Sequence, residues 1–418
     1  MILLLALLLL IALLGLPLFA ALGGAALVLV RHMDMDPAVL VIELNRLASS
    51  PNLIAIPLFT FAGVVMAAGG APQRLVRLFY AVLGRMPGGI ASVALGACAF
   101  FTAFSGASGI TILALGGLLY PILEKCGYPE RFSLGLLTTS GSIGLLFPPS
   151  LAVLVYGIVA GVNIDRLFLA GLIPGTLLML LLVAFNSARA RRLMLPRRSC
   201  TLEEFRRALL HGATELAMPP LILLGIFGGF VTVTEAAACT VVYVLVVEAL
   251  IFRTIRLREQ LIPLMRETCI LVGSILVILG VAMGLINLLI DAQVPDRLLA
   301  WVEGHVGSRA LFLLILNLTL LAVGAIMDIF SAIVVVVPLL LPLAARYGVD
   351  PFHLGVVMLA NLEIGYNTPP VGINLFIASQ RFGQPVFRLF RATLPFLAVM
   401  LAWLGLVTWI PFLSLWWK

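Results

Sequence analysis

Two Pro-Pro pairs interrupt apolar stretches of this sequence and carry polar residues beside them. Pro148 and Pro149 stand in the segment Gly144-Leu-Leu-Phe-Pro-Pro-Ser150, and the second pair stands in Gly365-Tyr-Asn-Thr-Pro-Pro370. Proline lacks a backbone N–H and frees carbonyl groups in the preceding turn of a helix. Freed carbonyls together with Ser, Thr and Asn oxygens suit a hard cation such as Na⁺. Both breaks are therefore candidate cation sites.

Two further breaks are rich in glycine or polar residues: Ser105-Gly-Ala-Ser-Gly109 and Met327-Asp-Ile-Phe-Ser331. A helix that begins inside a membrane presents free N–H groups and the positive end of its dipole. Helices that start after Gly109, near Ser331 and after each Pro-Pro pair would therefore favour an anion. No Arg or Lys stands within the four breaks, so an anionic substrate could be held there without a buried cationic side chain.

Single residues in the breaks have a functional and a structural interpretation. Asp328 is an expected intramembrane carboxylate, which by default indicates a functional site, with helix capping as the alternative. For Ser105 and Ser108 we favour ligand binding over small-residue helix packing. Thr111 is either a ligand or a threonine bonded back to its own helix. The polar residues beside the Pro-Pro pairs are further candidate ligands: Ser150, Asn367 and Thr368.

Glu235 is a second expected intramembrane acid, in the segment Thr234-Glu-Ala-Ala-Ala238. It could cap a half-helix through Thr234, join two helices, or contact a ligand. We favour a structural or gating role over direct ligand contact.

The composition requires these breaks to lie in a membrane protein. Of the 418 residues, 62% are hydrophobic and 11% are charged, whereas soluble domains average about 45–50% and about 25%. At about 20 apolar residues per span, we expect roughly ten to twelve spans. The net charge of +7 fits basic cytoplasmic loops better than nucleic-acid binding. The Cys and His residues are scattered, which argues against an enzyme and against a metal or other cofactor.

Charge and hydropathy also predict the topology at three places. Residues 1–30 read as a first transmembrane helix rather than a signal peptide, because no Lys or Arg precedes Arg31. The Arg-rich segments 189–207 and 253–266 are placed on the cytoplasmic side. The stretch between them would cross twice and break near Gly228. Residues 201–210 read as a short amphipathic surface helix with a capping box, or as an ordinary solvated helix.

The sequence also contains an approximate duplication. Five pairs of residues are separated by 221 positions: Gly63 and Gly284, Pro121 and Pro342, Gly144 and Gly365, Pro148 and Pro369, and Pro149 and Pro370. Each copy has a break, a short apolar arm, a polar loop and a Pro-Pro break in the same order. Paired interrupted helices in two halves of a membrane protein indicate the binding site of a secondary transporter. The sequence alone leaves open whether the repeats are inverted.

The breaks resemble those of one transporter family. The chain is similar to the large membrane subunit (DctM-like permease) of the tripartite ATP-independent periplasmic (TRAP) transporters. The resemblance covers most of the chain and rests on segments that occur in this order: Ile56-Pro-Leu-Phe-Thr-Phe-Ala-Gly63, Phe104-Ser-Gly-Ala-Ser-Gly109, Gly144-Leu-Leu-Phe-Pro-Pro-Ser150, Leu169-Ala-Gly-Leu-Ile-Pro-Gly175, Thr234-Glu-Ala-Ala-Ala238 and Asn367-Thr-Pro-Pro-Val-Gly372.

The resemblance implies a fold. It would be an all-α polytopic membrane protein, an elevator-type transporter with inverted repeats, two Pro-Pro-broken helices and re-entrant hairpins at 88–123 and 311–343. Residues 1–87 would be scaffold helices and 88–187 the first transport repeat. Residues 188–310 would form a cytoplasmic connector with further scaffold helices. Residues 311–418 would form the second transport repeat and the C-terminal helix.

The resemblance also implies a site. Sodium would be bound by two groups of residues: Ser105, Gly106, Ser108, Gly144 and Pro148, and Asp328, Gly365, Asn367 and Thr368. Substrate would bind between these groups at Ser108, Thr111, Pro149, Ser150, Asn367 and Pro370. At the first tip this chain has Ala107 where the family often has a serine.

The implied activity is Na⁺-coupled uptake of a small organic acid across the bacterial inner membrane. A periplasmic binding protein would deliver the substrate, and a small four-span membrane subunit would complete the scaffold. A stand-alone Na⁺/divalent-anion symporter is the alternative. A channel and a membrane-embedded enzyme fit the paired breaks less well. The sequence does not identify the organic acid.

Overall fold

The computed structural model describes residues 11, 16–84, 86–194 and 202–418. Every regular element in these ranges is helical, as required of a backbone that satisfies its own hydrogen bonds within hydrocarbon. Eight of the described helices are long and apolar enough to cross a membrane, or up to nine with the bent pair Glu130–Leu146 and Leu151–Ala160. Our estimate of ten to twelve spans is too high for this part of the chain, because several apolar helices have only 10–17 residues.

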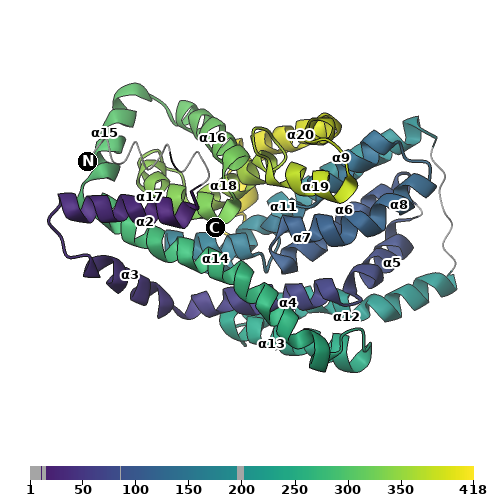
Figure 1. The fold of residues 1–418 in the computed structure, drawn as a ribbon. Helices are drawn as coiled ribbons and strands as arrows, with labels where there is room; N and C mark the ends of the chain where they lie inside the picture. The colour runs from purple at the N-terminus through teal and green to yellow at the C-terminus, as the bar shows by residue number, and fades with distance from the viewer. Residues whose placement is uncertain (1–10, 12–15, 85, 195–201) are drawn as a thin grey trace.

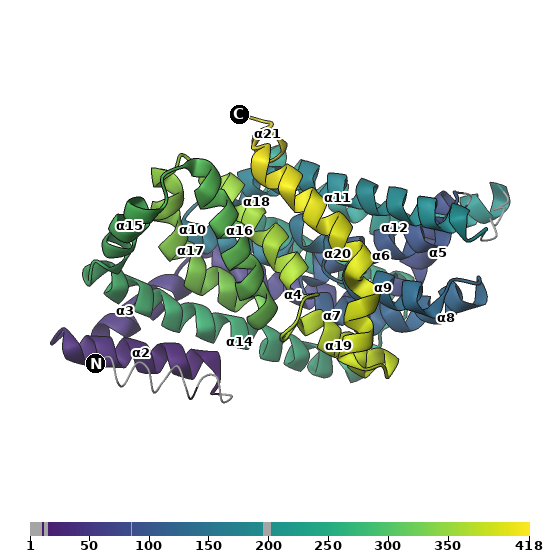
Figure 2. The same ribbon diagram turned by 90° about the horizontal axis from the view of Figure 1, so that it is seen from above.

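One group of helices packs around the longest helix, α14 (Leu257–Asp291). It contains α2 (Leu18–His32), α3 (Ala38–Ala48), η1 (Pro51–Ile54), α4 (Ala55–Ala68), α5 (Ala71–Leu83), α12 (Leu202–Phe227), α13 (Val233–Leu245) and the π-helical turn η4 (Val246–Ile251). Helix α14 contacts α2, α3 and α4, while α4 contacts α13 and α5 contacts α12. Figures 1 and 2 show α14 running along the molecule beside α2 and α4. We call these helices the α14 group.

The two sequence repeats fold into similar successions of helices. The first contains α6 (Gly89–Ser105), α7 (Ser108–Thr111), η2 (Ile112–Gly116), α8 (Gly117–Lys125), α9 (Glu130–Ser140), η3 (Ile143–Leu146) and α10 (Leu151–Ala160). The second contains α16 (Arg309–Ile326), α17 (Ile329–Arg346), α18 (Pro351–Gly365) and α19 (Ile373–Phe382). In both, a helical hairpin precedes a helix that ends just before the Pro-Pro pair. The N-cap residues of α7 and α17, Ala107 and Asp328, keep the 221-residue offset (328 − 107).

The repeats are interlocked. Helix α10 of the first repeat packs against α17 and α18, and α19 of the second packs against α7 and η2. The Tyr156 hydroxyl donates a hydrogen bond to the Pro351 carbonyl at 2.6 Å. The remaining helices connect or flank the repeats: α11 (Ile164–Arg192), α15 (Val294–His305), α20 (Val386–Trp409) and α21 (Phe412–Leu415). Each repeat's helix after the Pro-Pro pair therefore lies against the hairpin of the other repeat.

Four local expectations have different outcomes in the structure. Residues 202–210 are not a separate surface helix but the start of the 26-residue helix α12; their capping residue, Thr201, lies outside the described residues. The expected first span at 1–30 also lies partly outside them, and its described part is the 15-residue helix α2. The expected re-entrant hairpin at 311–343 consists of α16 and α17, two 18-residue helices that are each long and apolar enough to cross a membrane. The expected break near Gly228 is confirmed, since α12 ends at Phe227 and α13 begins at Val233.

Candidate functional site

The first hairpin turns at Gly106. This residue ends α6 in the left-handed conformation, with φ of 64°, and its N–H donates to the Thr102 carbonyl at 2.8 Å. A Cβ atom at this position would lie 2.4 Å from the Leu151 side chain. Glycine is therefore required both by the backbone conformation and by the close approach of α10. Ser105 and Ser108, on either side of the turn, are buried.

The first Pro-Pro break packs against this tip. A Cβ on Gly144 would lie 2.2 Å from the Ala99 carbonyl oxygen, so the backbones of η3 and α6 are in contact. The Thr102 hydroxyl donates to the Gly141 carbonyl at 2.8 Å and lies 2.7 Å from the Thr111 hydroxyl. Because Thr102 uses its single proton on Gly141, Thr111 is the donor between the two threonines. Thr111 is therefore bonded to Thr102 in the other arm of the hairpin, and Thr102 in turn joins the hairpin to Gly141, just before the break.

The second tip is capped by its own carboxylate. Asp328 accepts hydrogen bonds from the N–H groups of Phe330 and Ser331, both at 3.0 Å, and its second oxygen accepts from the Ser331 hydroxyl. The Ile329 N–H donates to the Tyr366 hydroxyl. The expectation that a helix starting near Ser331 offers free N–H groups to an anion is therefore wrong. The helix begins at Ile329, and its first turn is satisfied by Asp328 and Tyr366.

The second Pro-Pro break packs against the second tip as the first does. A Cβ on Gly365 would lie 2.5 Å from the carbonyl carbon of Gly324. The Ala325 carbonyl accepts from the N–H groups of Val371 at 3.0 Å and Gly372 at 3.1 Å. Each break is therefore fixed to the hairpin of its own repeat through a glycine that allows two backbones to touch.

Buried polar side chains join the two breaks. Asn367 Nδ2 donates to the Glu363 carbonyl at 2.9 Å and to the Ser142 hydroxyl at 3.3 Å, and Asn374 Nδ2 donates to Asn367 Oδ1 at 3.4 Å. The Ser142 hydroxyl lies 3.5 Å from the Glu363 carbonyl. Ser142 and Glu363 are themselves 221 residues apart. Equivalent residues of the repeats thus meet each other, as happens on a two-fold axis. We call Ser142, Asn367 and Asn374 the central polar cluster.

Several buried oxygen atoms near the breaks have no hydrogen-bond partner among the described residues. They are the Ser150 hydroxyl, Asn374 Oδ1 and both carboxylate oxygens of Glu363. A buried acceptor without a partner costs about 1–3 kcal/mol. Oxygen atoms in this condition suit a hard cation, whose ligands are carboxylate, carbonyl, hydroxyl and amide oxygens. The chemistry of the breaks therefore fits Na⁺.

The other predicted residues lie in different surroundings. Pro148 and Pro149 are buried, and the second pair is more accessible, with Pro370 exposed. Both Pro-Pro peptide bonds are cis. The Thr368 hydroxyl donates to the Ile364 carbonyl in the last turn of the preceding helix α18 at 2.9 Å. Glu235 is exposed and forms a capping box at the start of α13 with Thr232, not with Thr234, which agrees with a structural role.

Sequence reasoning missed four residues of the site: Thr102, Ser142, Tyr366 and Asn374. Ser142 could have been found from the repeat, because it precedes Gly144 by two positions as Glu363 precedes Gly365. Asn374 lies seven residues after Asn367, and only the turn at the Pro-Pro pair brings their side chains together. Thr102 lies in an apolar stretch and gives no sequence signal of its partners. Tyr366 stands inside the second Pro-Pro segment, but nothing in the sequence indicates that its hydroxyl accepts from the Ile329 N–H.

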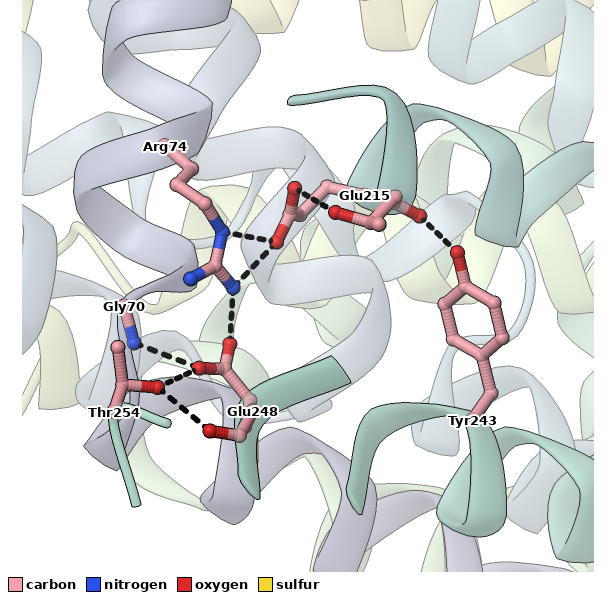
Figure 3. A network of polar contacts seen from close by, with 7 residues as sticks. Gly70, Arg74, Glu215, Tyr243, Glu248 and Thr254 are labelled. Atoms are coloured by element: carbon pink, nitrogen blue, oxygen red, sulfur yellow. Dashed lines mark hydrogen bonds and ion pairs between the residues drawn. The ribbon is translucent and has the colours of Figure 1, made fainter. Parts of the chain in front are cut away.

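A buried ion network in the α14 group was also missed (Figure 3). Arg74 of α5 lies 2.6 Å from a carboxylate oxygen of Glu215 on α12 and also pairs with Glu248 of η4. The Glu248 carboxylate accepts from the Gly70 N–H at 3.0 Å and from the Thr254 hydroxyl. All three charged side chains are at least nine-tenths buried. The network connects three helical segments that are distant in sequence.

The fold and the site define an integral membrane transporter built from two interlocked repeats. The family described as "Tripartite ATP-independent periplasmic transporter, DctM component" matches residues 2–413. The chain belongs to this family, and it is a transporter permease subunit rather than an enzyme.

Named relatives agree with the family. The chain is 36% identical to the C4-dicarboxylate TRAP transporter large permease protein DctM of Pseudomonas aeruginosa, over 94% of this chain and 92% of that protein. It is 35% identical to the isethionate TRAP transporter permease protein DctMQ of Oleidesulfovibrio alaskensis, over 95% of this chain and 63% of that protein.

A third relative has a different named substrate. The ectoine/5-hydroxyectoine TRAP transporter large permease protein UehC of Ruegeria pomeroyi is 31% identical, over 84% of this chain and 82% of that protein.

The crystal structure of the Alcanivorax borkumensis YdaH transporter has a similar fold, with a TM-score of 0.62 at 16% identity, covering 92% of this chain and 89% of that one.

Proposed function

We propose that this chain carries a small organic acid across the bacterial inner membrane by Na⁺-coupled uptake. The observation that carries the proposal is the convergence of both Pro-Pro breaks on the central polar cluster, within two repeats of a TRAP permease. Two of the relatives are named for anionic substrates, C4-dicarboxylate and isethionate. A small organic anion is thus the substrate class that the family and the site support best.

Sodium would be bound where each tip meets its own break. The first group is Ser105, Gly106, Ser108, Gly144 and Pro148; the second is Asp328, Gly365, Asn367 and Thr368. Buried oxygens without partners, such as Ser150 Oγ and Asn374 Oδ1, support this chemistry. Asp328 would act in part through its cap, since it fixes the N-terminus of α17 beside the second break.

Substrate would lie between the two groups, at Ser108, Thr111, Pro149, Ser150, Asn367 and Pro370. The first tip supports an anion better than the second, because Ala107 provides no side-chain cap whereas Asp328 does. Thr111 would act by fixing the tip to Gly141 through Thr102. The exposed position of Pro370 gives this region access from outside the packed core.

The hairpins α6 to α8 and α16 to α17 would be re-entrant, and the repeats would move as one body against the α14 group in an elevator mechanism. The interlocked packing of α10 on α17 and of α19 on α7 supports a single moving body. The contact between the repeat equivalents Ser142 and Glu363 supports a two-fold relation between the repeats, which we propose to be the inverted one found in many secondary transporters.

The transporter would work with a four-span membrane subunit and a periplasmic binding protein, as expected for one component of a tripartite periplasmic transporter. Membership of the DctM family favours this over a stand-alone symporter.

Uptake into proteoliposomes tests the proposal. The chain, its small subunit and its binding protein are reconstituted, and uptake of a radiolabelled C4-dicarboxylate is followed with an inward Na⁺ gradient. We expect accumulation that stops when K⁺ replaces Na⁺ and when the binding protein is omitted. Accumulation that is equal in both salts would overturn sodium coupling. Full activity without the binding protein would overturn the tripartite mechanism.

A further inference from the structure

A pocket of about 540 Å³ lies outside the site, where the start of α9, the last turns of α11 and the first half of α20 meet. Its wall is apolar and partly aromatic, with Phe132, Phe185, Pro395 and Phe396 among the lining residues. The ring centroids of Phe132 and Phe396 are 5.5 Å apart, and those of Phe185 and Phe396 are 5.3 Å apart. Because the rings pack on one another, the wall is built into the fold.

Three arginines line the same pocket: Arg131 of α9 and Arg189 and Arg192 of α11. All three are exposed, and none has a carboxylate partner among the described residues. The Arg131 guanidinium donates one hydrogen bond to the Arg391 carbonyl at 2.9 Å. By contrast, Arg388 on the nearby helix α20 is paired with Glu130 at 2.8 Å. The pocket therefore combines an apolar wall with three cations whose charge is not neutralised by the described part of the protein.

This combination is complementary to one kind of molecule, an amphiphile with an anionic head. Guanidinium groups bind phosphate oxygens with paired, charge-assisted hydrogen bonds. Basic pockets between membrane helices on the cytoplasmic side suit anionic lipid headgroups. Arg189 and Arg192 belong to the basic last turn of α11, which opens the Arg-rich segment assigned to the cytoplasmic side. A free phosphate would use the arginines but leave the aromatic wall without a role.

We propose that this pocket binds an anionic phospholipid of the cytoplasmic leaflet. Its phosphate would bind Arg189 and Arg192 of α11 together with Arg131 of α9, and the start of an acyl chain would lie against Phe185 and Phe396. The lipid would bridge α9, α11 and α20. The inference does not depend on the identity of the transported acid or on sodium coupling.

Native mass spectrometry of the purified chain tests the proposal, with phosphatidylglycerol and phosphatidylcholine as probes. The pocket variant is R189Q/R192Q. The matched control is R191Q/R206Q, which removes the same charge from two exposed arginines that do not line the pocket. We expect the wild type and the control to retain phosphatidylglycerol over phosphatidylcholine. The pocket variant should bind phosphatidylglycerol about ten-fold or more weakly, because each arginine near an anionic lipid headgroup contributes to the binding free energy.

Two further experiments distinguish a lipid phosphate from free phosphate and test the role of the aromatic side chains that line the pocket. An excess of inorganic phosphate should leave the bound lipid in place, and F396A should weaken lipid binding while retaining the arginines. Equal binding of the two lipids, or equal loss in the pocket variant and the control, would overturn the proposal. Displacement of the lipid by inorganic phosphate would show that the pocket binds small anions, and would contradict a specific lipid site. If F396A fails to fold, F185A, whose ring is only half-buried, gives the same comparison.

Discussion

Asp328 shows how one residue of the site can combine two tasks. Its carboxylate caps α17 by accepting from Phe330 and Ser331, and the same residue stands beside the second break through the Ile329 to Tyr366 hydrogen bond. Capping and cation binding both use carboxylate oxygens, but only cation binding requires the negative charge. The two tasks are therefore separable by substitution.

We predict that D328A and D328N differ in stability but not in transport. D328A loses the cap and should be destabilised by about 0.5–2 kcal/mol, whereas Asn caps almost as well as Asp. Both variants lose the charge, so both should lose Na⁺-driven uptake while still inserting into the membrane. Thermal unfolding and proteoliposome uptake measure the two effects. Near-normal uptake by both variants would remove Asp328 from the sodium site.

At the scale of elements, glycine allows each Pro-Pro break to touch its own hairpin. A Cβ on Gly365 would collide with the backbone of Gly324 at 2.5 Å, and backbone cannot move aside as a flexible side chain can. The contact fixes the distance between the second tip and the second break, and therefore between the residues proposed to share a sodium ion.

We predict that G365A is destabilised by about 1–3 kcal/mol through overpacking and loses most of its uptake. The control is G405A in α20, where nothing lies within 4 Å of the added carbon. G405A should be neutral, or stabilised by up to about 1 kcal/mol through helix propensity. Unfolding midpoints and uptake rates would be compared. Equal behaviour of the two variants would show that the close contact at Gly365 is unimportant.

A second prediction at this scale concerns the ion network of the α14 group. Removing Arg74 leaves two buried carboxylates, Glu215 and Glu248, without their shared partner. We expect R74A to lose about 3–5 kcal/mol of stability, as when one member of a buried ion pair is removed. R77A removes an exposed arginine of the same helix and should change little. Similar thermal unfolding of R74A and R77A would show that the ion network does not contribute to the stability of the protein.

The sequence predicted the elements around the breaks because proline and glycine act locally. The family resemblance placed both hairpins, the 221-residue repeat aligned their breaks, and Pro148 and Pro369 marked the helix ends. Contacts between distant segments were not predictable in the same way. Arg74 finds its partners 141 and 174 residues away, and Ser142 meets Asn367 only because the repeats interlock. The capping role of Asp328 was foreseen as an alternative, but the free N–H groups expected at the second tip were not found.

At the scale of the whole molecule, the chain is one subunit of a larger assembly. Many apolar side chains of the α14 group are exposed in the isolated chain, among them Val41 and Ile42 of α3 and Leu221 and Leu224 of α12. Lipid or another subunit can cover such a surface.

We predict that a tagged chain, extracted from its native membranes in mild detergent, co-purifies with a small membrane protein of about four spans in equal amounts. Quantitative mass spectrometry of the eluate measures the ratio. The proposed periplasmic binding protein should be retained weakly or not at all, because it would dissociate after delivering the substrate. A chain that purifies alone and transports an anion by itself would favour the stand-alone symporter.

The proposed sodium site is tested most directly by the effect of sodium on the stability of two asparagine variants. Asn367 belongs to the central polar cluster, whereas Asn361 of the preceding helix α18 is equally buried but contacts Asn317. A ligand that binds the native state raises its stability, by about 2.7 kcal/mol at a hundred times its dissociation constant. We predict that Na⁺, but not K⁺, stabilises the wild type and N361A and fails to stabilise N367A. Equal stabilisation by both salts, or a full sodium response in N367A, would contradict the proposed site.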